Sequence, residues 1–116
     1  MALHSQEPLN IQDLDGSKPG QRILRFHGPV VLGTVFQFQA AIRAKDAPSL
    51  IMDFTEVPYI DSAGIGALVG AYVSQNKEGR KLALVGVSDR LFAALQVTRV
   101  ERFFKIYASL PEAQEA

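Results

Sequence analysis

The chain contains no cysteine, which excludes disulfide bonds, thiolate nucleophiles and thiolate metal sites and suits a reducing compartment. It has no excess of charge, because twelve basic residues balance twelve acidic ones, so the electrostatic footprint of a nucleic-acid-binding protein is missing. No apolar run is long enough to cross a bilayer, and the first ten residues lack the pattern of a secretion signal. We therefore expect a cytoplasmic protein without membrane insertion, whose partner is a protein or a small ligand.

The length and the hydrophobic pattern predict a single α/β domain. A chain of 116 residues, 47% of them hydrophobic, suits one domain with one core. Apolar and polar residues alternate over 9–14 and 21–26, on either side of a turn-forming stretch, which predicts an N-terminal hairpin. The apolar runs at 50–52 and 81–87 predict strands covered on both faces, and a last short strand is expected at 104–107.

Helical spacing alternates with these strands. A first helix is predicted where Val35, Phe38 and Ile42 share a stripe, with Leu32, Phe36 and Ala40 beside it, before Pro48. A second runs from about Ser62 to Glu78, and Ser88 caps a third. The order ββαβαβαβ predicts a mixed, mostly parallel sheet with helices packed against it. We assign residues 9–110 to this domain, 1–8 to a flexible N-terminus and 111–116 to a polar C-terminal tail, frayed or weakly helical.

The second helix is unusual because three glycines lie inside it, at a cost of about 2–3 kcal/mol relative to alanine. Asp61 or Ser62 is the predicted N-cap. One face is apolar and suits the sheet: Ile65, Leu68, Val69, Tyr72 and Val73. The opposite face carries almost no side chains: Ala63, Gly64, Gly66, Ala67, Gly70, Ala71 and Ser74.

Two interpretations account for this small-residue face. It can lie beneath another element of the domain, where glycine permits close approach of the backbone. Alternatively it stays open as a docking surface, since an uncharged patch of small residues is easily desolvated by a partner. We favour the docking surface, because a helix that follows a parallel strand normally turns one face to the sheet and the other to water.

Ser62 also has two interpretations. As an N-cap it contributes about 1 kcal/mol to stability. As a phosphorylation site it gains nearly two negative charges at a helix N-terminus, where the helix dipole tolerates them and neighbouring Asp61 opposes them, so the fold changes little. The same charge at a protein interface costs several kcal/mol of binding free energy, so such a serine can act as a switch.

The segment DFTEVPYIDSAGIGAL, residues 53–68, resembles the signature of STAS domains, specifically the bacterial anti-sigma-factor antagonists. The resemblance implies that Ser62 is phosphorylated by a serine kinase that is also the anti-sigma factor, and dephosphorylated by a metal-dependent serine phosphatase. It also implies that Asp61, Gly64 and Gly66 belong with Ser62 to a partner-binding site, which the small-residue face extends to Ala63, Ala67 and Gly70. One departure bears on partner identity: Val31 stands where the family often has aspartate.

The function implied by the resemblance is anti-sigma factor antagonism. The unmodified protein binds the kinase and so releases a sigma factor, and phosphate on Ser62 blocks that contact. The alternative is a constitutive adaptor or scaffold subunit, of a stress-signalling complex or a lipid-transport ATPase system, in which Ser62 is only a cap. The sequence leaves a homodimer and a small ligand at the strand ends open.

We expect no enzyme activity, and neither a cofactor nor a metal site. The sequence DSAGIG is not a nucleophile elbow, and only His4 and His27 are available as a base for a serine nucleophile. Three carboxylates could suggest acid-base or metal chemistry, but each has a simpler interpretation. Asp53 ends a strand, Glu56 solvates a loop and Asp61 caps a helix.

Overall fold

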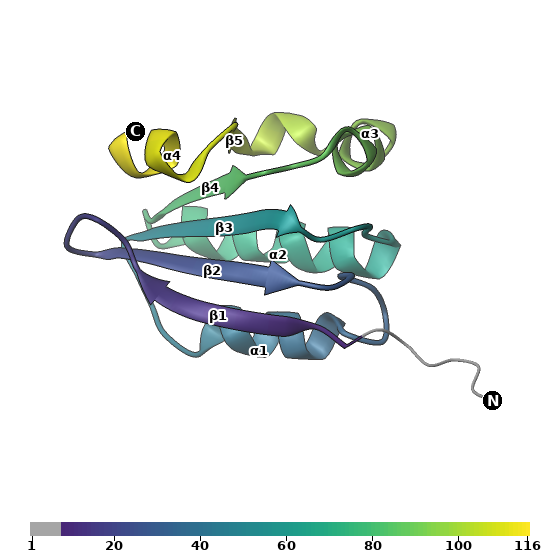
Figure 1. Ribbon diagram of the computed structural model, residues 1–116, viewed down its shortest axis with the longest axis horizontal. Helices are drawn as coiled ribbons and strands as arrows, with labels where there is room; N and C mark the ends of the chain where they lie inside the picture. The colour runs from purple at the N-terminus through teal and green to yellow at the C-terminus, as the bar shows by residue number, and fades with distance from the viewer. Residues whose placement is uncertain (1–7) are drawn as a thin grey trace.

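The computed structural model describes residues 8–116, which form one five-stranded sheet with helices on both faces (Figure 1). The strands are β1 (Asn10–Asp15), β2 (Gln21–His27), β3 (Ser49–Glu56), β4 (Lys81–Val85) and β5 (Lys105–Tyr107). The helices are α1 (Val35–Arg43), α2 (Ser62–Lys77), α3 (Asp89–Val97) and α4 (Leu110–Glu115), with a 3-10 turn at Glu101–Phe103. β1 pairs with β2 antiparallel and all later neighbours are parallel, which confirms the predicted mixed α/β sheet and its N-terminal hairpin.

The strand order is the chain order, and this decides which face the first helices cover. Right-handed crossovers between successive parallel strands place their helices on the same side of the sheet. α1 and α2 accordingly lie together behind the strands in Figure 1. The main core fills the space between them and the sheet, with Phe26 contacting Phe38 and Phe54 at ring-centroid distances of 4.9 and 5.4 Å.

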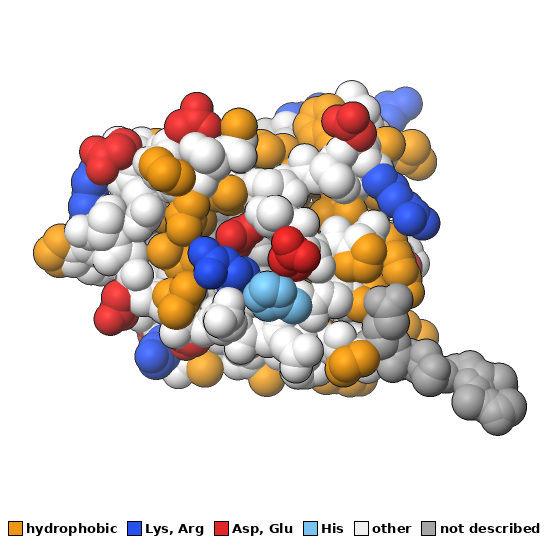
Figure 2. Space-filling view, viewed as in Figure 1, with side chains coloured by type: hydrophobic (Ala, Val, Ile, Leu, Met, Phe, Trp, Pro, Cys, Tyr) orange, Lys and Arg blue, Asp and Glu red, His pale blue; other side chains and the backbone are white. Residues whose placement is uncertain are grey.

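The other face of the sheet is covered in part by α4. Ala113 is buried against Ile23, Ile51 and Val85, and Ser109 caps the helix through the amide of Glu112. Of the two expectations for residues 111–116, frayed or weakly helical, the structure has the helix, because this segment buries an apolar residue on a sheet face that no other helix of residues 8–116 covers. Beyond α4 the face is open, and basic, acidic and histidine side chains meet at its centre (Figure 2). The expected flexible N-terminus lies outside the described residues, apart from exposed Pro8.

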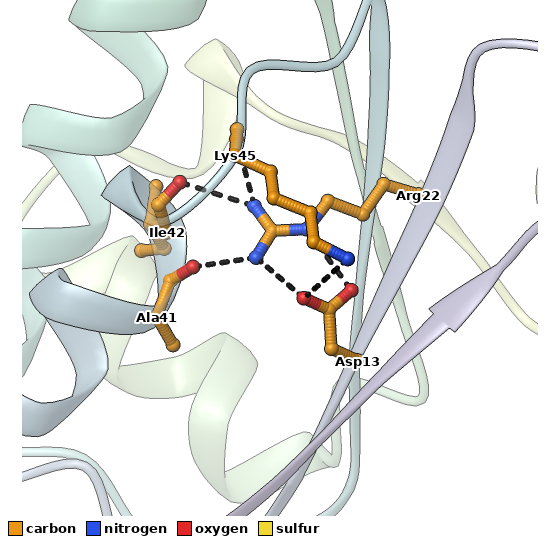
Figure 3. A network of polar contacts seen from close by, with 5 residues as sticks. All are labelled: Asp13, Arg22, Ala41, Ile42 and Lys45. Carbon is orange, nitrogen blue, oxygen red and sulfur yellow. Dashed lines mark hydrogen bonds and ion pairs between the residues drawn. The ribbon is translucent and has the colours of Figure 1, made fainter.

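A buried arginine ties the N-terminal hairpin to the C-terminal end of α1 (Figure 3). The Arg22 side chain is only 6% exposed, and its Nε and Nη2 donate to the carboxylate of Asp13 at 3.1 and 2.9 Å. Its Nη groups also donate to the carbonyls of Ala41, Ile42 and Lys45, at 2.6, 3.1 and 2.9 Å. The carbonyl of Ala41 also accepts from the amide of Ala44 at 3.4 Å, so the guanidinium binds a strand carboxylate and adds donors to carbonyls at and just after the end of α1.

In the part of the chain that the structure describes, none of the helices combines the length and the apolar composition that a membrane span requires.

Candidate functional site

The loops after β2 and β3 are joined where α1 and α2 begin. Val30 forms a parallel bridge with Ile60, its amide donates to the carbonyl of Tyr59 at 3.2 Å, and its carbonyl accepts from the amide of Asp61 at 3.3 Å. The carboxylate of Asp61 then accepts from the amide of Leu32 at 3.0 Å. These bonds place the segment around Leu32 beside the N-terminus of α2.

Asp61, rather than Ser62, caps α2. Its backbone is extended, and its Oδ1 accepts from the amide of Gly64 at 2.9 Å. Ser62 is the exposed first residue of the helix, and within residues 8–116 its hydroxyl makes no hydrogen bond. The interpretation of Ser62 as a cap is therefore wrong, because the longer side chain one residue earlier already occupies that position. The hydroxyl faces solvent at the positive end of a helix of sixteen residues.

Each interpretation of the small-residue face of α2 holds for part of it. Gly64, Ala67 and Ala71 are buried, and a Cβ on Gly64 would collide with the carbonyl of Val30. Gly66 and Gly70 are exposed, and a Cβ on either would meet no atom within 4 Å. The expectation that Gly64 and Ala67 are open to a partner is thus wrong, because the loop after β2 and helix α1 cover them. Ala63 is half-buried, and Ser74 is exposed.

The apolar face of α2 is also narrower than predicted. Ile65 and Leu68 are buried in the main core, and Tyr72 stacks on Phe103 at a ring-centroid distance of 5.4 Å. Val73, expected against the sheet, is 54% exposed. The helix turns this valine outward because buried Ala67 and Ala71 shift its packed side toward α1.

Two exposed apolar side chains of the neighbouring segment complete the site. Leu32 is 69% exposed and Phe36, in the first turn of α1, is 78% exposed. Phe36 lies on one stripe of α1 with Gln39 and Arg43, which line a groove of about 140 Å³ against Gly70 of α2. The exposed residues Leu32, Phe36, Ser62, Gly66 and Gly70 are called the Ser62 surface below.

The sequence analysis did not single out Leu32 and Phe36 as exposed. The available signal was that both lie beside the stripe of Val35, Phe38 and Ile42, of which Val35 and Phe38 are fully buried. Phe36 follows the buried Val35 by one residue, and this step turns its side chain about 100° around the helix axis.

Asp53 has a structural role inside β3, which continues to Glu56, so the expectation that Asp53 ends the strand is wrong. Burial of its carboxylate opposes ionisation, but bonds from the hydroxyl and amide of Thr55, at 2.6 and 2.9 Å, and from Arg25 at 3.2 Å outweigh it. The pKa of Asp53 is therefore lowered from its ordinary value of 3.8. Its contribution to stability is present above that pH and is lost as the pH falls through the lower folded value.

The other acidic and histidine side chains considered for catalysis do not lie together in one site. No three acidic or histidine side chains gather into a possible metal site within the described part of the chain. The Nε2 of His27 contacts Oε1 of Gln12 at 3.2 Å on the open sheet face, and Glu56 is exposed at the end of β3. His4 lies outside the described residues.

The capping geometry predicts that two neighbouring substitutions differ in their effect on the free energy of unfolding. Asp61→Ala should lower the free energy of unfolding by about 1–2 kcal/mol, because the amides of Gly64 and Leu32 lose their acceptor. Ser62→Ala should change it by less than about 0.5 kcal/mol, as an exposed residue that caps nothing. Urea denaturation of both variants measures this. A larger loss for Ser62→Ala than for Asp61→Ala would contradict the assigned cap.

The profile of the STAS domain family matches residues 15–113, and the chain belongs to that family. Among curated proteins, the anti-sigma-B factor antagonist of Listeria monocytogenes is 39% identical over 64 residues, which is 55% of this chain and 56% of that protein. The match thus spans about half the length of this relative.

Two crystal structures share the fold over most of the chain. An anti-sigma factor antagonist from Mycobacterium paratuberculosis has a TM-score of 0.75 and 22% identity, covering 90% of this chain and 91% of its own. A sulfate transporter family protein from Wolinella succinogenes has a TM-score of 0.76 and 26% identity, covering 84% of each chain. The same architecture thus occurs in proteins of two different functional classes.

Proposed function

We propose that the protein is a cytoplasmic anti-sigma factor antagonist whose Ser62 surface binds a serine-kinase anti-sigma factor and is switched off by phosphorylation of Ser62. The main support for the proposal is the hydroxyl of Ser62, which is exposed and does not cap α2. It lies beside a surface that has almost no side chains on α2 and is apolar at Leu32 and Phe36. The Listeria relative, named as an anti-sigma-B factor antagonist, supports the same partner class.

The geometry explains why phosphate would change binding more than folding. The amides of Ser62 and Ala63 belong to the first turn of α2, where backbone donors have no partner inside the helix. A phosphate on Ser62 would lie at this positive end, so the free energy of unfolding should change little. A docked partner would cover the same phosphate, and desolvating it would cost far more.

The direct test is a phosphorylation assay with the anti-sigma factor of the same organism and ATP, followed by mass spectrometry of the chain. We expect one phosphate, on Ser62, and none on the Ser62→Ala variant. Reversal by a serine phosphatase of the same organism would complete the switch. Phosphate on another residue, or none after prolonged incubation with an active kinase, would contradict the proposal.

The two open glycines give a second prediction. Replacing Gly66 and Gly70 by alanine should raise the free energy of unfolding by about 1–2 kcal/mol, because each added methyl meets no atom and improves helix propensity.

Gly66→Arg should lower the affinity for the partner at least about tenfold, because the long side chain fills the surface that the glycine leaves open. Calorimetric titration measures the affinities, with Val97→Arg at the exposed end of α3 as the control. Equal losses for both arginine variants would contradict docking at the Ser62 surface.

A second candidate function is a constitutive STAS adaptor or scaffold, favoured by the likeness to the Wolinella sulfate transporter family protein. Such a domain would use a similar surface without any dependence on Ser62. The two candidates differ in one measurement: an adaptor binds its partner equally well as wild type, Ser62→Ala and Ser62→Asp, whereas a switch loses affinity only in the aspartate variant.

A further inference from the structure

A pocket lies at the amino ends of β4 and β5, at the opposite end of these strands from Ser62. β5 has only three residues, and its pairing with β4 begins where Ala83 faces Lys105. The first two residues of β4, Lys81 and Leu82, therefore have no strand beside them on that edge. The space left beneath β5 is a pocket of about 290 Å³, the size of a site for a small ligand.

The lining of this pocket is basic. Arg80, Lys81 and Lys105 contribute to it, and none of its lining residues is aspartate or glutamate. Lys81 and Ala83 point to one side of β4, and Lys105, paired with Ala83, points to the same side of the sheet. Arg80 has a partner in exposed Asp46 at 3.3 Å, while neither lysine forms an ion pair within residues 8–116. Two lysines without an ion-pair partner in the described part of the chain, Lys81 and Lys105, thus line one cavity together with Arg80 and the C-terminal residue Ala116.

The walls of the pocket are aromatic. Tyr72 and Phe103 stack at 5.4 Å between ring centroids on one side, and Tyr107 lines the other side. Planar rings beside cationic side chains suit a ligand with a flat apolar body and a negative group. Gln75 is already engaged, since its amide donates to the carbonyl of Lys81 at 2.9 Å.

We propose that this pocket binds a small organic anion, specifically a phosphate ester carried on a planar aromatic ring. Lys81 and Lys105 hold the phosphate, and the ring of Tyr107, on the same side of the sheet as both lysines, packs against the aromatic body. The site is separate from the Ser62 surface, which follows the carboxyl end of β3. The inference is consequently independent of the proposed function.

The test is an amide NMR titration of the full chain with 1-naphthyl phosphate. We expect saturable shifts concentrated at residues 80–83 and 103–107, and none at 62–70. Inorganic phosphate should shift the same amides with an affinity at least tenfold weaker. If 1-naphthol, which lacks the phosphate, binds as tightly, or if the pocket amides do not move at millimolar ligand, the proposal is overturned.

A pair of charge-matched variants assigns the anion contact. Lys81→Gln combined with Lys105→Gln should weaken binding of 1-naphthyl phosphate at least tenfold. Arg43→Gln combined with Arg90→Gln removes the same charge away from the pocket and should leave affinity within twofold. All four side chains belong to residues that are exposed, so the variants should stay folded, and an unchanged amide spectrum outside each substitution checks this. Equal weakening in both double variants overturns the site.

Discussion

Ser62→Asp should lower the affinity of the chain for the anti-sigma factor proposed as its partner about tenfold to a hundredfold, with almost no change in stability. The carboxylate would lie at the exposed N-terminus of α2, where the helix dipole accepts it in the free protein. In the complex it would be covered by the partner, and about 1.4–3 kcal/mol of uncompensated desolvation gives this loss. Isothermal titration calorimetry with purified partner measures the affinity.

Two control variants separate charge from shape at this position. Ser62→Asn is nearly the size of aspartate but uncharged, and it should retain most of the wild-type affinity. Ser62→Ala should bind as wild type does and resist inactivation by ATP. Equal affinity of the aspartate variant and wild type would contradict the proposed phosphorylation switch. Docking at the Ser62 surface would then still be tested by Gly66→Arg.

Arg22→Ala should destabilise the fold by about 2–4 kcal/mol, the largest effect expected from a residue outside the main core. The substitution removes both bonds to Asp13 and the three bonds to carbonyls at and just after the end of α1, of which that of Ala41 keeps the amide of Ala44 (Figure 3). The value lies below that of a fully buried pair because the Asp13 side chain keeps access to water. Urea denaturation measures the change in the free energy of unfolding, and Tm in thermal denaturation should fall by about 10–20 °C.

The acid limb of the stability curve gives a second readout of this network. The hydrogen bond from Arg22, opposed by partial burial and helped by the positive charges of Arg22 and Lys45, lowers the pKa of Asp13 from 3.8. The pair therefore stabilises the folded chain above that pH, and this part is lost as pH falls through the lower folded value. Arg22→Ala should reduce this acid-dependent loss of stability.

Lys45→Ala, which removes an exposed cation 3.7 Å from Asp13, should lower the free energy of unfolding by less than about 1 kcal/mol. A similar cost for both variants would contradict the role given to Arg22.

The fold was predictable from the sequence because local patterns and topology agreed. The alternating hairpin strands, the apolar runs of β3 and β4 and the cap at Ser88, whose hydroxyl accepts from the amide of Leu91 at 3.1 Å, are all present. The burial of the end of the chain was not predicted, since SLPEAQEA offers only Leu110 and the small Ala113 to the sheet. Ala113 becomes core only because the sheet leaves Ile51 and Val85 uncovered, which depends on strand order.

The start of α2 at the candidate site was predictable from the sequence, but the contacts that surround it were not. The DSAGIG segment marks the start of α2, but the burial of Gly64 depends on Val30, which lies more than thirty residues earlier in the chain. The choice between Asp61 and Ser62 as cap was equally beyond the sequence, because both residue types are good caps. The bonds between the loops after β2 and β3 determine both the burial of Gly64 and the choice of Asp61 as the cap. Helical periodicity in the sequence does not predict these bonds.

Docking of a protein partner on the Ser62 surface is measurable as amide hydrogen exchange with and without the anti-sigma factor. We expect new protection at residues 31–36 and 62–70, and loss of this protection when Ser62 is phosphorylated. Protection confined to the open sheet face around Arg25 and His27, or to the edge strand β1, with 62–70 unchanged, would contradict docking at this surface.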